Sequence, residues 1–204
     1  MVKTPKISSI SLDGGTLCLD YVNSVHDRRH EPLQDYLKNV QDLIAWSERV
    51  AIVDGRGRRR LETMAADNSR KGRSFFSDAL ALRELLYRIF FAITAGKKIV
   101  PADISQYNTH LSRHFSHIRL ILDAERYAET WDFPQDSFFQ ITAPIVKDAH
   151  ALLLSPGLER VKECPNCGWL FLDTTKNGKR RWCSMKNCGN SVKALEWYYR
   201  KKGA

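Results

Sequence analysis

Apolar residues recur three or four positions apart through most of the first 157 residues, as they do in amphipathic helices. The strongest pattern covers residues 77–96. Its apolar face is made by Leu82, Leu86, Ile89 and Ile93. Ser77 and Asp78 are residue types that cap the start of a helix, and Gly96 is typical of a helix end. We therefore predict a long amphipathic helix here.

Two shorter helices are predicted before this segment. Residues 16–28 follow the break at Gly14-Gly15, and residues 37–50 form the second segment. Both carry apolar residues at helical spacing. The stretch 53–73 that comes next is polar and basic, and we expect a helical turn or two in its middle.

The pattern changes twice after residue 96. Pro101 is typical of the first turn of a helix, and apolar residues continue behind it at helical spacing. Residues 118–122 and 127–133 then predict a small hairpin of two strands. A last long helix is predicted from residue 134 to about residue 154. Pro144 should kink or split it, because proline cannot donate a backbone hydrogen bond.

The Ser-Pro-Gly stretch at 155–157 ends this helical part and predicts a domain boundary. We therefore expect a mainly α fold: a helical N-terminal domain at 1–157 with a small β-hairpin, and a C-terminal module at 158–204. No run approaches the roughly 18 apolar residues of a membrane span, and the first residues do not resemble a signal peptide. We expect a cytoplasmic protein without a membrane partner.

Four of the five cysteines lie in the C-terminal module, in the spacing Cys-x2-Cys-x15-Cys-x4-Cys. They are Cys164, Cys167, Cys183 and Cys188. Two residues between the first pair allow a tight turn that points both thiolates at one centre, and the second pair can complete a tetrahedron. Four sulfur ligands favour Zn2+, and a module this small needs a metal to fold. We predict a structural zinc site; an iron–sulfur cluster or two disulfides are the weaker alternatives.

No residue pattern predicts catalysis. A catalytic zinc keeps an open position and usually has a His or carboxylate ligand, whereas residues 151–204 contain no His. The sequence also lacks a Ser/His/Asp or Cys/His set at a recognisable spacing, and it lacks a phosphate-binding Gly-x4-Gly-Lys-Ser/Thr loop. We therefore expect that this protein is not an enzyme.

Positive charge is concentrated in the same module. The chain has a net charge of +9, and residues 159–204 hold eleven Lys and Arg against four Asp and Glu. Such a surface favours a polyanion as partner, and a solvated surface that only aids solubility is the alternative. The candidate contacts to nucleic acid are Lys176, Lys179, Arg180, Arg181, Lys193, Arg200 and Lys201.

The last three of these cations share one face of a helix predicted at 191–201, together with Trp197. We expect the opposite side of that helix, with Val192, Leu195 and Tyr199, to face inward.

The segment CGWLFLDTTKNGKRRWCSMKNCGN at 167–190 closely resembles the CGNR zinc finger of bacterial proteins. The segment LCLDYVNSV at 17–25 resembles the LDFVNT signature of the ABATE domain, which usually precedes that finger. The resemblance implies that the four cysteines bind zinc and that the protein is a stress-induced transcription regulator whose partner is DNA. The Arg of the CGNR signature falls on Ser191 here.

Asp20 and Asn23 are polar residues inside the apolar segment 17–25. They are candidates for binding a small-molecule effector; the alternative is that they bond nearby backbone groups inside the fold. The function we expect is a DNA-binding transcriptional regulator with a helical domain that senses an effector or forms a homodimer. The alternative is a protein-interaction or small-molecule-binding protein whose zinc module is purely structural.

Overall fold

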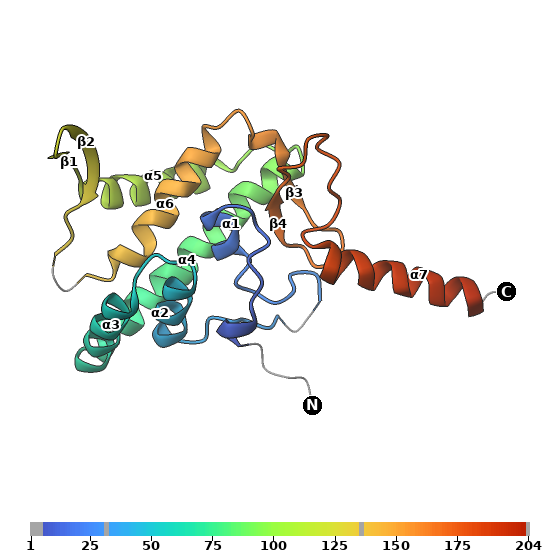
Figure 1. Ribbon diagram of the computed structural model, residues 1–204, viewed down its shortest axis with the longest axis horizontal. Coiled ribbons are helices and arrows are strands. Elements are labelled where there is room, and N and C mark those ends of the chain that lie inside the picture. The colour runs from blue at the N-terminus through green and yellow to red at the C-terminus, as the bar shows by residue number, and fades with distance from the viewer. Residues whose placement is uncertain (1–5, 31–32, 135–136, 203–204) are drawn as a thin grey trace.

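The computed structural model describes residues 6–30, 33–134 and 137–202, and it confirms a mainly α fold (Figure 1). The helices are α1 (Leu17–Val22), α2 (Val40–Arg49), α3 (Gly55–Asp67), α4 (Ser69–Thr94), α5 (Pro101–Phe115), α6 (Phe139–Leu153) and α7 (Asn190–Lys202). Two antiparallel pairs of strands complete the fold: β1 (Ile118–Asp123) with β2 (Arg126–Trp131), and β3 (Val161–Glu163) with β4 (Leu170–Leu172). No helix within the described ranges is long and apolar enough to cross a membrane.

Helix α4 is the centre of the helical body, and α1, α2, α3 and α5 all pack against it (Figure 1). Its predicted apolar face is buried at Leu82, Leu86 and Ile89. The predicted start is wrong by eight residues, because the Asn68 side chain accepts a hydrogen bond from the Lys71 N–H (3.0 Å) and caps the helix earlier.

The basic stretch at 53–73 is helical almost throughout, so the prediction of one or two turns is also wrong. Asp54 caps α3 by accepting the Gly57 N–H at 2.7 Å. Only Leu61 and Ala65 of this helix are buried. The other positions are exposed or half-buried and are mainly good helix formers, so the helix forms without a marked apolar periodicity.

The predicted hairpin is present, with β1 paired to β2 from Ile118↔Trp131 to Asp123↔Arg126. Ala124 adopts a φ of +53° in the turn. Helix α6 begins at Phe139 and remains one helix through Pro144, so it is not split there. It packs on α1 and α5.

The C-terminal module shares one hydrophobic core with the helical body. Val161, Leu170 and Phe171 are buried in the same cluster as the inward residues of α1 and α4. Strand β3 packs on α4, and β4 packs on both α1 and α4. The core therefore continues across the predicted boundary at residue 157.

Helix α7 projects away from the rest of the molecule (Figure 1). None of its residues is buried, and 54% of Leu195 and 67% of Tyr199 are exposed. The prediction that Val192, Leu195 and Tyr199 face inward is therefore wrong. The amphipathic pattern is present, but no described part of the chain covers the apolar face.

Candidate metal centre and basic surface

The four predicted cysteine ligands come together. Their sulfur atoms all lie within 4.8 Å of one another, and all four side chains are buried. The Sγ atoms of Cys167 and Cys183 are 3.6 Å apart, as are those of Cys183 and Cys188. A disulfide needs about 2.05 Å. Tetrahedral zinc with bonds of about 2.3 Å places its sulfurs about 3.8 Å apart. The geometry fits a four-sulfur metal site and not a pair of disulfides.

The first ligand pair sits in the turn between β3 and β4. The Gly168 N–H donates to the Cys164 carbonyl at 2.9 Å, and the Cys164 N–H donates to the Trp169 carbonyl at 2.8 Å. Gly168 has a φ of +72°, which favours glycine, and an added Cβ would lie 3.1 Å from the Arg28 Cβ. The turn therefore depends on glycine both for its conformation and for its closeness to the helical body.

The second ligand pair is built differently. Cys183 lies in a loop, and Cys188 lies in a π-helical turn, Met185–Gly189, that runs directly into α7. An added Cβ at Gly189 would approach the Met185 sulfur at 2.5 Å and the Trp182 ring at 3.1 Å. The metal centre thus fixes the start of α7.

The thiols of this cluster cannot all ionise unaided. Hydrogen bonds from the Cys167 and Cys183 thiols lower the pKa of Cys164 well below its usual value. The same contacts with Cys164 raise the pKa of Cys167 and of Cys183 far above theirs. Four neighbouring thiolates therefore need a cation, and Zn2+ with four cysteine ligands meets that need. Zn2+ is the cofactor of this site.

A network of backbone contacts docks the metal centre on the helical body. The Trp169 Nε1–H donates to the Val25 carbonyl at 2.7 Å. The Arg28 N–H donates to the carbonyl of the ligand Cys167 at 2.9 Å. Both contacts are on the first cysteine turn, so the zinc module is fixed to the segment that follows α1.

Asp20 and Asn23, the candidate effector residues, both bond backbone groups. The Asn23 amide donates to the Leu170 carbonyl at 2.7 Å and accepts the Leu170 N–H at 2.9 Å. The Asp20 carboxylate accepts the Gly14 N–H at 2.8 Å, and burial raises the pKa of Asp20 to about 6. The structure places Asn23 at the joint between α1 and β4.

The buried carboxylate of Asp173 organises the basic loop 174–182, a role that the sequence prediction missed. It accepts hydrogen bonds from the Lys162 ammonium (2.7 Å), the Arg180 N–H (2.8 Å) and the Thr175 hydroxyl (2.6 Å). The Lys162 hydrogen bond holds the pKa of Asp173 well below its usual range. The signal in the sequence was an Asp directly before a loop, a residue type that bonds turn backbone.

The predicted basic residues fall into three groups. In the loop, Lys176, Lys179 and Arg181 are exposed. Arg180 is instead half-buried and bonded to the module: its guanidinium donates to the Trp182 carbonyl at 2.9 Å and to the Cys183 carbonyl, and it stacks over Phe171.

The third group lies on α7, where Lys193, Arg200 and Lys201 are exposed. The Lys201 ammonium lies 4.5 Å from the centroid of the Trp197 ring. The Ser191 hydroxyl donates to the Asn187 carbonyl at 2.7 Å, within the turn that carries Cys188. The loop and α7 both lie at the end of the molecule opposite the β1–β2 hairpin (Figure 1).

Two protein families match this chain. The CGNR zinc finger matches residues 160–201, which include all four cysteines. The ABATE family, whose description is "Putative stress-induced transcription regulator", matches residues 15–156. A search of the curated proteins found no match. Because the second match spans more than half of the sequence, this chain belongs to the ABATE family and carries a C-terminal CGNR zinc finger.

Proposed function

We propose that this protein is a DNA-binding transcriptional regulator whose zinc centre presents the basic loop and α7 to the phosphate backbone. The carrying observation is a set of cations without acidic partners. None of Lys176, Lys179 and Arg181 forms an ion pair with any residue that the structure describes. Within the same module, Glu163 pairs with Arg29 and Asp173 pairs with Lys162. These two acids are thus paired within the fold, while the three loop cations face solvent.

The form of α7 supports a contact with duplex DNA. Its 13 residues make a helix about 20 Å long, and an α-helix fits the major groove, which is about 12 Å wide. Lys193, Arg200 and Lys201 share one face, and the helix projects from the body without any buried residue (Figure 1). Such a helix is free to enter a groove or to lie along the backbone.

The role of zinc in this function is structural. All four ligands are cysteines, and they flank the basic loop and immediately precede α7. Arg180 and Asp173 then fix the loop from inside, through the Cys183 carbonyl and the Arg180 N–H. We expect removal of zinc to abolish DNA binding because it releases both basic segments.

The test is the salt dependence of binding to a random-sequence duplex, measured by fluorescence anisotropy with zinc-loaded protein. The variant is Lys176→Gln/Lys179→Gln/Arg181→Gln. If all three residues contact phosphates, the slope of log K against log salt should fall by about 2.7, since each contact contributes about 0.9. The zinc content should not change, because none of the three is a ligand.

The matched control is Arg56→Gln/Arg59→Gln/Arg73→Gln, which removes the same charge from exposed positions of α3 and α4. The control should keep the wild-type slope apart from a small effect of net charge. Equal affinity and equal slope in the two triple variants would contradict the proposal. If the zinc-loaded wild-type protein does not bind duplex DNA, the alternative of a purely structural zinc module is favoured. The hydrogen bond from Trp169 to the Val25 carbonyl, which docks the module on the helical body, supports that alternative.

A further inference from the structure

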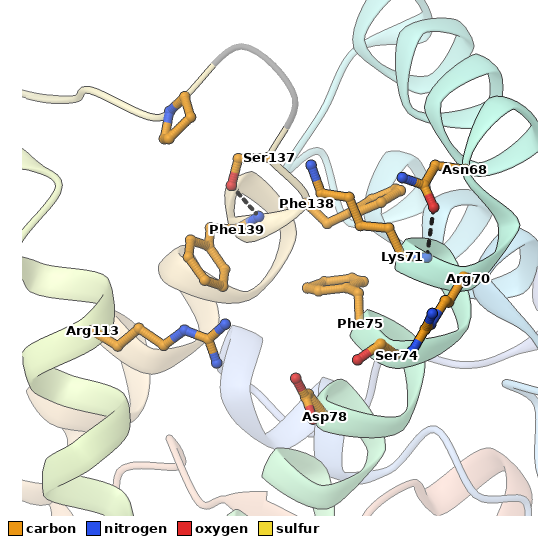
Figure 2. Close-up of a pocket in the computed structure, with 11 residues that line it drawn as sticks. Asn68, Arg70, Lys71, Ser74, Phe75, Asp78, Arg113, Ser137, Phe138 and Phe139 are labelled. Carbon is orange, nitrogen blue, oxygen red and sulfur yellow. Dashed lines mark hydrogen bonds between the residues drawn. The ribbon is translucent and has the colours of Figure 1, made fainter.

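A cavity of about 590 Å³ opens in the helical body, between the first turns of α4, the last turn of α5 and the start of α6 (Figure 2). The first turns of α4 and α6, which border it, lie at the end of the body away from α7 (Figure 1). The volume is within the range of about 300–1,000 Å³ that is typical of small-molecule sites. Neither the zinc centre nor the proposed DNA surface uses this cavity.

Aromatic rings form much of its wall. Phe75 of α4 stacks on Phe138, with ring centroids 5.0 Å apart and an angle of 18° between the planes. Phe139 lies across from Phe75, and both are only partly buried (Figure 2). Phe138 covers one face of Phe75, and the Phe139 ring contacts Arg113 and His114, so each ring offers only part of its apolar surface to the cavity.

Positive charge borders these rings. The Arg113 guanidinium lies 4.4 Å from the centroid of Phe139 and points into the cavity, while Arg70 lies on the opposite side (Figure 2). Neither arginine forms an ion pair with any residue in the described ranges. Lys71 also lines the cavity, and Asp78 is the single acid among the lining residues of the described chain. The cavity is therefore positively charged as well as aromatic.

We propose that this cavity binds a small aromatic carboxylate. The ring would lie between Phe75 and Phe139, and the carboxylate would accept hydrogen bonds from Arg113 or Arg70, since a guanidinium matches a carboxylate in geometry and charge. Three phenylalanines, Phe75, Phe138 and Phe139, line the site beside Arg113, so it should select a flat organic anion over bare phosphate. This site does not depend on DNA binding.

Isothermal titration calorimetry on the zinc-loaded full chain tests the site with 2-naphthoate as the probe. We expect 2-naphthoate to bind. The neutral alcohol 2-naphthalenemethanol lacks the carboxylate, whereas cyclohexanecarboxylate and inorganic phosphate lack an aromatic ring. Each of these three compounds should bind at least about tenfold more weakly. Failure of 2-naphthoate to bind, or equal affinity for the neutral alcohol, would overturn the proposal.

Two variants locate the site. Arg113→Gln/Arg70→Gln should weaken 2-naphthoate binding by about tenfold to hundredfold, the usual effect of losing a charge-assisted hydrogen bond. Ser74→Glu places a like charge on an exposed lining position and should also abolish binding, and it decides the matter if the double variant does not fold. The control Arg73→Gln changes an exposed arginine of the same helix that does not line the cavity. Wild-type affinity in Ser74→Glu would contradict the location.

Discussion

The replacement Asn23→Ala should destabilise the joint between the helical body and the zinc module. Asn23 is only 1% exposed, and its side chain bonds both the N–H and the carbonyl of Leu170, which is completely buried. Alanine removes both partners at once. Each unsatisfied buried group costs about 1–3 kcal/mol, so the free energy of unfolding should fall by about 2–6 kcal/mol.

This loss is large relative to the total stability of a typical domain, which is about 5–15 kcal/mol. For a chain of this size each kcal/mol shifts the melting temperature by about 2–4 °C. The melting temperature should therefore fall by at least about 4 °C. It should fall by more than about 10 °C if no water bonds to the N–H and the carbonyl of Leu170 in the variant. The assay is urea and thermal unfolding of zinc-loaded protein, followed by circular dichroism.

The control for this prediction is Asn108→Ala, at an exposed position of α5 whose side chain forms no hydrogen bond with the part of the chain that the structure describes. It should change the free energy of unfolding by no more than about 0.5 kcal/mol. A similarly small change in Asn23→Ala would refute the reasoning. It would show that the Leu170 contacts add little, and a ligand-binding role for Asn23 would then become the better explanation.

Three further changes should affect stability or metal retention. Gly189→Ala should speed the transfer of zinc to a chromogenic chelator, because the added Cβ would crowd Met185 and Trp182. The control Gly157→Ala, whose Cβ would lie 3.8 Å from the Ser155 hydroxyl, should not change this rate, and equal rates in the two variants would count against the crowding. Burial lowers the pKa of His114 to about 4 in the folded protein, whereas an unfolded histidine is protonated near pH 6.5. The free energy of unfolding should therefore fall by up to about 3 kcal/mol as the pH falls from about 6.5 to about 4, and His114→Gln should lack this decrease. Curves of stability against pH that are parallel for wild type and His114→Gln would contradict this prediction. Removal of zinc should lower the melting temperature of the whole chain, because the zinc module shares its hydrophobic core with the helical body. An unchanged melting temperature would show that the zinc site does not stabilise the helical body.

The sequence was sufficient for the features that depend on local spacing. The cysteine turn needs only Cys-x2-Cys with a following glycine, and the structure places that glycine, Gly168, at a φ of +72°. The long helix α4 was recognisable because its buried positions recur at helical spacing. The length of helix α3 was underestimated because only Leu61 and Ala65 are buried, which is too few to produce a periodic pattern.

Features that depend on distant partners could not be predicted. Asn23 bonds a backbone 147 positions away, so the sequence left its role open between a ligand site and a structural contact. Arg180 was grouped with the other loop cations, and nothing in a basic run distinguishes the one that turns inward to the Cys183 carbonyl. For α7, periodicity identified an apolar face at Leu195 and Tyr199 but could not show that no described segment covers it.

The central claim is that Cys164, Cys167, Cys183 and Cys188 hold one zinc ion and thereby fix the basic C-terminal end of the protein. Zinc K-edge X-ray absorption on freshly purified protein, combined with elemental analysis, tests it most directly. The account predicts one zinc per chain with four sulfur neighbours at about 2.3 Å. A spectrum with nitrogen or oxygen in place of any sulfur, or protein that folds without metal, would contradict it.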